Sequence, residues 1–256
     1  ANSLMPLTGE EVILTVSGDI TLNVSSNNDI LDGVNGTGTM DVVIDAAGNI
    51  DPGAVDYNGS QGIRFNDLTV EDCDVTYENV DNKIFVNGDL SVTEQGTLLP
   101  ENTLGHFVFD GNSAKVITVN EDAVLNFIDL SVINSAAVTT ASDFTIKDIF
   151  HVEAGASFNA TDGQVMFDYQ TDADAVNPIT PGTVSFNDLF ITGGFDRNLT
   201  PANGFTIKGD FTKFSYIDFR PSAGEIIFDN EAAAELTFGG DPVVFHDVKV
   251  AAASNI

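Results

Sequence analysis

A six-residue phrase occurs four times in this 256-residue chain, and its copies begin at Phe65, Phe127, Phe186 and Phe245. A period that stays this close to about sixty residues identifies a repeat architecture, in which each repeat is a structural unit stacked on its neighbours. The phrase is therefore expected to be scaffold rather than an active site. Its copies are Phe65-Asn66-Asp67-Leu68-Thr69-Val70, Phe127-Ile128-Asp129-Leu130-Ser131-Val132, Phe186-Asn187-Asp188-Leu189-Phe190-Ile191 and Phe245-His246-Asp247-Val248-Lys249-Val250.

Two further phrases lie between these copies. The second is Val16-Ser17-Gly18-Asp19-Ile20, Val86-Asn87-Gly88-Asp89-Leu90 and Ile207-Lys208-Gly209-Asp210-Phe211, with Ile146-Lys147-Asp148-Ile149-Phe150 lacking the glycine. The third is Gly105-His106-Phe107-Val108-Phe109-Asp110, Gly163-Gln164-Val165-Met166-Phe167-Asp168 and Gly224-Glu225-Ile226-Ile227-Phe228-Asp229, preceded by Asp41-Val42-Val43-Ile44-Asp45. Every step from one phrase to the next is close to twenty, and the steps back to the first phrase are on average the shortest. The pattern predicts a unit of about twenty residues, three of which form the sixty-residue repeat.

The residues between turns are those that form strands. The chain has 19 Phe, no Trp and 23 Gly, its strand-like runs are rich in Val and Ile, and it contains no convincing amphipathic helix. A sandwich gives no reason for a twenty-residue echo, and a propeller blade needs roughly 40 to 50 residues. We therefore expect one all-β domain over residues 1–256, a parallel β-solenoid of about twelve coils with a three-coil super-repeat. At about 4.8 Å per coil such a stack is roughly 55 to 60 Å long.

The first phrase contains a corner. Leu68 and Val70 alternate as inward residues of a strand, but Phe65 lies three residues before Leu68 and breaks the period of two. A corner at Asn66-Asp67 reconciles the two, because Asn and Asp tolerate turn backbone and bond to neighbouring backbone groups. The Asp residues of all three phrases are thus predicted to be corner residues.

The alternation of Phe-Asn-Asp-Leu-Thr-Val (65–70) with Phe-Thr-Ile-Lys-Gly-Asp-Phe (205–211) resembles secreted bacterial surface proteins built as right-handed parallel β-helices. This class includes filamentous-haemagglutinin-like adhesins and large repeat proteins of Bacteroidetes. The resemblance extends from about Val12 to Val250 and concerns architecture. It implies a right-handed solenoid, an extracellular or cell-surface location and an adhesive or structural role, and it carries over no catalytic residue.

The chain is strongly acidic, with a formal net charge of −30. This charge opposes binding to nucleic acid or to an anionic membrane, and no apolar run is long enough to insert into one. Clustered carboxylates also attract divalent cations, and the chain has two acidic clusters, at residues 71–74 and 172–174. Neither cluster matches a known calcium loop. No cofactor is expected beyond a possible Ca²⁺ ion. The candidate metal ligands are Asp72, Asp74, Asp172 and Asp174.

An enzyme is not expected. The histidines His106, His151 and His246 show no triad or metal spacing, and 39 acids guarantee meaningless carboxylate pairs. Sugar clefts usually offer aromatic platforms, and this chain has no Trp and four Tyr. A β-helical polysaccharide-active enzyme or carbohydrate-binding module is nevertheless kept as an alternative, as is a stalk segment of a giant adhesin.

The order of the phrases suggests assembly. The chain begins with a second phrase and finishes on a first phrase, so a second copy placed after it would continue the series. Uncapped solenoid ends template strand addition, and a heterologous contact that does not close makes a filament. We expect copies to stack head to tail, with residues 1–12 as a donor strand or extension, residues 251–256 as an extension, and a possible cell-surface anchor or glycan as a further partner. The expected interface residues are Leu4, Leu7, Val12, Phe245, Val248, Val250 and Ile256.

Overall fold

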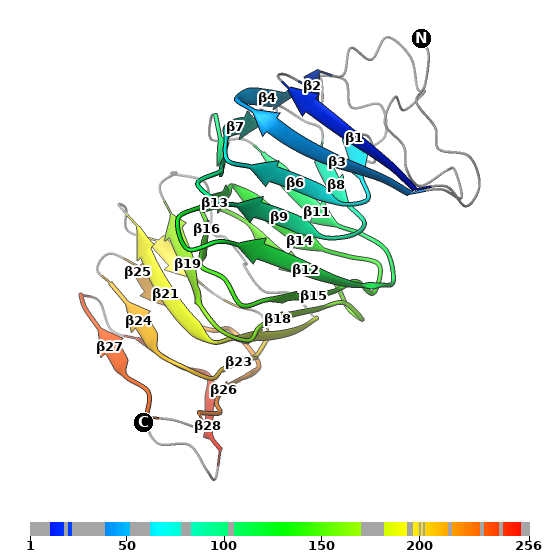
Figure 1. The fold of residues 1–256 in the computed structure, drawn as a ribbon. Coiled ribbons are helices and arrows are strands. Elements are labelled where there is room, and N and C mark those ends of the chain that lie inside the picture. Colours follow the sequence, from blue (N-terminus) through cyan, green and yellow to red (C-terminus); the bar gives the residue numbers. More distant parts are fainter. Residues whose placement is uncertain are drawn as a thin grey trace.

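The computed structural model describes residues 11–17, 20–21, 39–51, 62–77, 83–101, 105–169, 182–193, 197–199, 201, 203–214, 217–230, 233–240 and 243–251. These residues form a parallel β-solenoid without a helix, in which the chain winds repeatedly through the same sheets (Figure 1). The all-β solenoid fold is confirmed. The right-handed sense stays a prediction, and the general preference of parallel crossovers for that hand supports it.

Sheet A is the longest and has eleven strands, each hydrogen-bonded to the strand one coil away. Ten steps of about 4.8 Å give it a length of about 48 Å. β1 and β28 lie at opposite ends of the stack (Figure 1). In order, the strands are β1 (Glu11–Ser17), β3 (Thr39–Ala46), β6 (Leu68–Glu71), β9 (Leu90–Thr93), β12 (Ala114–Val119), β15 (Ala137–Thr140), β18 (Ser157–Ala160), β20 (Thr183–Phe186), β23 (Phe205–Ile207), β26 (Glu225–Phe228) and β28 (Asp247–Val250).

Sheet B has ten strands and follows sheet A in each coil. Its strands are β2 (Ile20–Thr21), β4 (Gly48–Asp51), β7 (Asp74–Tyr77), β10 (Thr97–Pro100), β13 (Val124–Phe127), β16 (Phe144–Ile146), β19 (Gln164–Tyr169), β21 (Asp188–Gly193), β24 (Phe211–Lys213) and β27 (Leu236–Phe238).

Sheet C lies between a strand of sheet B and the next strand of sheet A in five of the described coils. It consists of β5 (Gly62–Phe65), β8 (Lys83–Val86), β11 (His106–Phe109), β14 (Asp129–Val132) and β17 (Phe150–Val152). The pair β22 (Arg197–Leu199) and β25 (Ile217–Phe219) takes the same place in chain order in the C-terminal coils.

The core is a column of apolar side chains inside the coils. Strands such as β6, β13 and β20 alternate buried and partly exposed residues, as expected for a half-buried strand. Aromatic rings stack edge to face from coil to coil: Tyr77 and Phe107 have centroids 4.9 Å apart, and Phe107 and Phe127 5.2 Å apart. The predicted inward residues Phe65, Leu68 and Val70 are all fully buried.

The coils are longer and fewer than expected. Along sheet A, Leu68 pairs with Leu90, Leu90 with Ile117, and Ile117 with Thr140, so each of these coils exceeds the predicted length. The average is roughly 23 residues per turn, and the described part of sheet A has eleven strands rather than the twelve coils predicted.

The three-coil super-repeat is a second correction. Between Phe65 and Phe127 the chain forms eight strands, β6 to β13, whereas three coils through three sheets need nine. The steps from first to second and from second to third phrase are whole coils, since Phe65 pairs with Val86 and Val86 with Phe109. The step from Phe109 back to the first phrase at Phe127 is too short for a coil and covers only two strands, β12 and β13.

Candidate functional site

The corner aspartates form hydrogen-bonded ladders from one coil to the next. Asp67 Oδ1 accepts the backbone N–H of Asp89 at 2.7 Å, and Asp89 Oδ1 accepts that of Val116 at 2.7 Å. In a later repeat, Asp188 Oδ1 accepts the N–H of Asp210 at the same distance. A corner leaves backbone donors without ladder partners, and these carboxylates satisfy them. The residues predicted to be corners are therefore structural in these positions.

The glycine of the second phrase makes room for this ladder. A Cβ at Gly88 would lie 1.9 Å from Asp67 Oδ1 and 2.8 Å from the Asn66 carbonyl oxygen. A Cβ at Gly209 would lie 1.9 Å from Asp188 Oδ1. Because the glycine has no side chain, the first-phrase carboxylate of one coil can lie directly against the backbone of the next coil.

A buried lysine lies beside the first ladder. Lys115 has no exposed surface, and its Nζ donates to the Asn87 carbonyl oxygen and, at 2.9 Å, to Ser113 Oγ. Burial lowers the pKa of Lys115, while the nearby carboxylates of Asp110, Asp89 and Asp67 oppose that shift. The lysine places a positive charge among acids whose mutual repulsion would otherwise weaken the corner.

The phrase without glycine produces a looser corner. Asp148 stands where the other copies have glycine. Asp129 Oδ1 accepts the N–H of Ile149 at 3.0 Å, compared with 2.7 Å for the equivalent bonds of Asp67 and Asp188. Burial, together with the charge of Asp148, raises the pKa of Asp129 to about 6, although the Ile149 N–H opposes the shift. This corner therefore carries a carboxyl group that titrates near pH 6.

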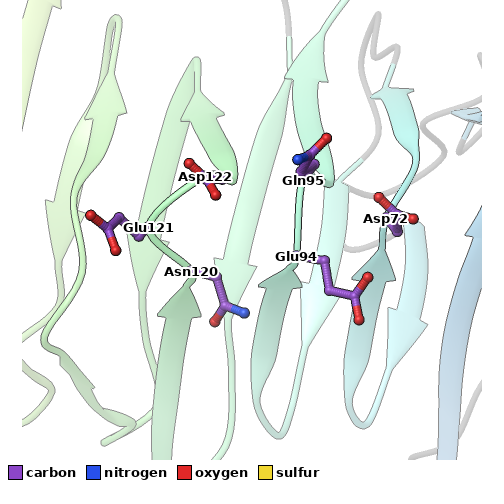
Figure 2. A pocket seen from close by; sticks show the side chains of 6 residues that line it. All are labelled: Asp72, Glu94, Gln95, Asn120, Glu121 and Asp122. Carbon is purple, nitrogen blue, oxygen red and sulfur yellow. The ribbon is translucent and has the colours of Figure 1, made fainter.

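An acidic hollow of about 560 Å³ opens at the corner between sheets A and B. It follows three successive turns, and Asp72 and Glu94 have left-handed backbone with φ of 49° and 56°. Figure 2 shows the six lining side chains pointing in different directions, with no shared focus. The lining residues are Asp72, Glu94, Gln95, Asn120, Glu121 and Asp122.

The hollow does not assemble the predicted cation ligands. Asp72 lines it, but Asp74 lies in β7, where its Oδ1 accepts the hydroxyl of Thr97 at 2.8 Å. No group of three or more His, Cys, Asp or Glu side chains in the described part of the chain could hold a metal ion. Asp172 and Asp174 lie outside the described residues. A diffuse attraction for cations is the chemistry that this surface supports.

Sheet C carries a histidine and serine pair that the sequence did not suggest. His106 Nε2 and Ser131 Oγ are 2.7 Å apart, because His106 lies on β11 and Ser131 on the adjacent β14. Burial, together with the electrostatic influence of Lys83 and His151, lowers the pKa of His106 to about 4. The imidazole is therefore neutral at pH 7 and can accept the serine proton in a hydrogen bond.

The pair is a contact between adjacent strands of sheet C, and its serine is buried. Ser131 is 5% exposed, and a serine nucleophile must be reachable by its substrate. Of the other two histidines, His151 pairs with Ser131 across the ladder, and His246 is an exposed partner of Asp247 at 2.9 Å. The sequence signal that could have predicted the contact between His106 and Ser131 is the coil length, since residues one coil apart in the sequence become neighbours on adjacent strands.

The expected assembly residues fall into two groups. Val12 lies within β1 and pairs with Met40 of β3, so the end of the predicted donor segment is already a strand of this chain. Phe245 packs against a cluster of phenylalanine rings, 5.9 Å from Phe219, and Val248 and Val250 lie on β28. Leu4, Leu7 and Ile256 lie outside the described residues.

No helix in the described residues is long and apolar enough to cross a membrane. Comparisons with protein-family models, with curated proteins and with solved structures gave no match. The assignment that the residues support is a parallel β-solenoid with carboxylate-laddered corners.

Proposed function

We propose that this chain is a non-enzymatic structural segment of an extracellular filament or adhesin, and that its copies assemble head to tail by stacking the ends of the solenoid. The observation that carries the proposal is the apolar end formed by β27 and β28. Val248 and Val250 are 47% and 46% exposed, whereas Ile226 and Phe228, their partners one coil earlier, are 0% and 1% exposed. These valines occupy core positions that lack a following coil in the described residues.

The rest of this end has the same character. Phe238 of β27 is 45% exposed, although Lys213, its partner one coil earlier, has no exposed surface. Burying an apolar side chain of this size contributes roughly 1.5 to 3 kcal/mol, and the open edge of β28 offers backbone partners to an added strand. Such an end is suited to another solenoid coil.

The opposite end and the sides favour a second copy as the occupant. β1 and β2 are the first strands of sheets A and B, so their outer edges are open within the described residues. The chain carries a net charge of −30, which repels lateral neighbours. A contact between unlike ends does not close and gives a filament. The extracellular location is supported by the resemblance of the phrases to surface β-helices.

The test is assembly of the purified chain. Sedimentation velocity and electron micrographs should show rods that lengthen with protein concentration, and the double variant Val248→Asp/Val250→Asp should remain monomeric. Val124→Asp is the matched control, because Val124 is 44% exposed on the side of the rod and should leave assembly intact. A wild-type chain that stays monomeric at high concentration overturns self-assembly and favours a stalk segment continued by its own polypeptide.

No observation favours the alternative of a sugar-active enzyme to the same degree. The six residues lining the acidic hollow include no aromatic side chain to stack on a sugar ring. The side chains point in different directions rather than pairing as acid and base (Figure 2).

A further inference from the structure

The first phrase changes position from one repeat to the next. Its first copy turns from sheet C into sheet A, because Phe65 ends β5 and Leu68 begins β6. The second copy turns from sheet B into sheet C, between β13 and β14, and the third turns from sheet A into sheet B, between β20 and β21. Each repeat therefore starts one corner earlier around the solenoid than the repeat before it.

Within one repeat the three phrases stay in register. Phe127 pairs with Ile146 and Ile146 with Phe167, just as Phe186 pairs with Ile207 and Ile207 with Phe228. The corner residues of the three phrases therefore lie one above another, at the same corner, in three successive coils. The phrases then move to another corner, because the first repeat advances eight strands whereas three coils contain nine.

After three repeats the phrase returns to its starting corner. The fourth copy turns into sheet A again, since Asp247 begins β28 and the Val244 N–H donates to the Phe219 carbonyl oxygen of β25 at 3.0 Å. Residues 243–245 thus continue the side of the solenoid that β25 forms. The phrase that should stack on this fourth copy is a second phrase at the same corner.

The N-terminal second phrase sits at a different corner. Val16 lies on β1 of sheet A, Ile20 begins β2 of sheet B, and Val16 pairs with Ile44 of the third phrase there. A copy stacked with sheet A over sheet A would therefore put its second phrase one corner away from the first phrase it should continue.

We infer that stacked copies are rotated relative to one another by one sheet, so that β2 of the incoming copy pairs with β28 and its β1 pairs with residues 243–245. This inference rests on the proposed end-to-end assembly. Internal pairs give the register: Leu68 with Leu90 and Leu189 with Phe211 correspond to Val248 with Ile20 of the second copy. Lys249 then lies opposite Thr21 of that copy, as Thr69 lies opposite Ser91.

The corner of the fourth phrase carries the acceptor that this arrangement uses. Asp67 and Asp188, which occupy the same phrase position as Asp247, each accept an N–H from the aspartate of the following second phrase. Asp247 has 64% of its side chain exposed and contacts His246. Rotation by one sheet brings a second phrase to this carboxylate, and three such rotations bring a filament back to its starting orientation after three subunits.

Disulfide trapping distinguishes the two orientations. Cys73 is the chain's single cysteine and is replaced by serine in all variants, so that it forms no competing disulfide. In this Cys73→Ser background, cysteines at Lys249 and Thr21 should link neighbouring chains, because adjacent strands hold paired Cα atoms within the roughly 4.4 to 6.8 Å that a disulfide needs. Cysteines at Lys249 and Thr15 report the unrotated stack. In that stack, the register that aligns the apolar residues of β1 with those of β28 places Lys249 opposite Thr15, which is exposed on β1.

The expected result is a ladder of oxidised oligomers from the Lys249→Cys/Thr21→Cys chain and loss of that ladder with Lys249→Cys/Thr15→Cys. Cross-linking only through Thr15, or equally through both positions, overturns the rotation while leaving end-to-end assembly standing. Sedimentation of the Cys73→Ser chain alone checks assembly separately, and its failure counts against the proposed function. Averaged filament images should also show features that recur every three subunits, and a recurrence at every subunit contradicts the rotation.

Discussion

Tyr77 joins two coils through its hydroxyl group. The side chain is fully buried, its Oη donates to the Asn126 carbonyl oxygen at 3.0 Å, and the Ile128 N–H donates to it at 3.1 Å. Ile128 follows Phe127 in the corner between sheets B and C, where the backbone leaves its regular ladder. A single hydroxyl therefore satisfies two backbone groups of a buried corner, and burial raises the pKa of Tyr77 so that the hydroxyl stays protonated.

Tyr77→Phe should lower the free energy of unfolding by about 1 to 3 kcal/mol, because it leaves the Ile128 N–H buried without its acceptor. Denaturant titration followed by circular dichroism measures the change. Thr97→Val is the control, since it removes an exposed hydrogen bond to Asp74 and should cost much less. Equal effects of the two variants would contradict the role given to Tyr77.

Two titratable groups of sheet C, His106 and Asp129, make the stability of the fold respond to pH in opposite directions. The pKa of His106 falls to about 4 in the folded chain, so the unfolded chain binds the proton more readily and folding loses stability as pH falls from about 6.5 to 4. The pKa of Asp129 rises to about 6, so the folded chain binds the proton more readily and stability increases as pH falls from about 6 to 4. The two contributions partly cancel.

His106→Gln should remove the first response, so that this variant gains about 1 to 3 kcal/mol relative to wild type between pH 7 and pH 4.5. Asp129→Asn, which retains an oxygen acceptor for Ile149, should show the reverse trend. Urea unfolding at several pH values measures both. Parallel pH profiles for the two variants and the wild type would show that neither group has a shifted pKa.

The elements of this fold are coils joined at three corners, and a corner depends on the coil beneath it. Gly88 illustrates this dependence, because the space for its missing side chain is taken by Asp67 Oδ1 and the Asn66 carbonyl oxygen of the previous coil. The glycine needs no special backbone angle; it is required by the approach of another strand. A corner sequence is therefore selected by two coils at once.

Gly88→Ala should lower the free energy of unfolding by about 1 to 3 kcal/mol, because the new Cβ displaces either the Asp67 carboxylate or the corner backbone. Thermal unfolding measures the loss, and Gly239→Ala is the control, since its Cβ would come no nearer than 3.3 Å to the Phe214 ring. In an Asp67→Ala background the same substitution should cost less. A Gly88→Ala cost that is unchanged in that background would rule out the carboxylate as its cause.

At the scale of the whole molecule, charge and apolar ends act in opposite directions. The chain carries 39 acidic side chains against nine Lys and Arg, so two copies that approach end to end repel each other before they touch. The exposed valines and Phe238 at the C-terminal end favour contact only at short range. Ionic strength should therefore control how readily copies meet.

Raising the salt concentration from about 0.01 M to 0.1 M shortens the screening length from about 30 Å to 10 Å, and it should promote assembly measured by light scattering. NaCl and CaCl₂ compared at equal ionic strength separate screening from specific binding. A much larger effect of Ca²⁺ that is abolished by Asp72→Asn/Asp74→Asn would instead establish the predicted cation ligands. Assembly that weakens with salt would contradict the role of repulsion.

The sequence by itself determined the solenoid, its buried phenylalanines and its aspartate corners, because these features are local and periodic. The spacing of Phe65 from Leu68 predicted a corner, and the structure has one there. Only the tertiary structure decided which sheet each phrase occupies, because the coils vary in length and do not all follow the twenty-residue echo. The contact of His106 with Ser131 likewise depends on register between coils. Local sequence patterns specify a strand and the turn that follows it. The length of each coil decides which strand of the next coil lies above that strand.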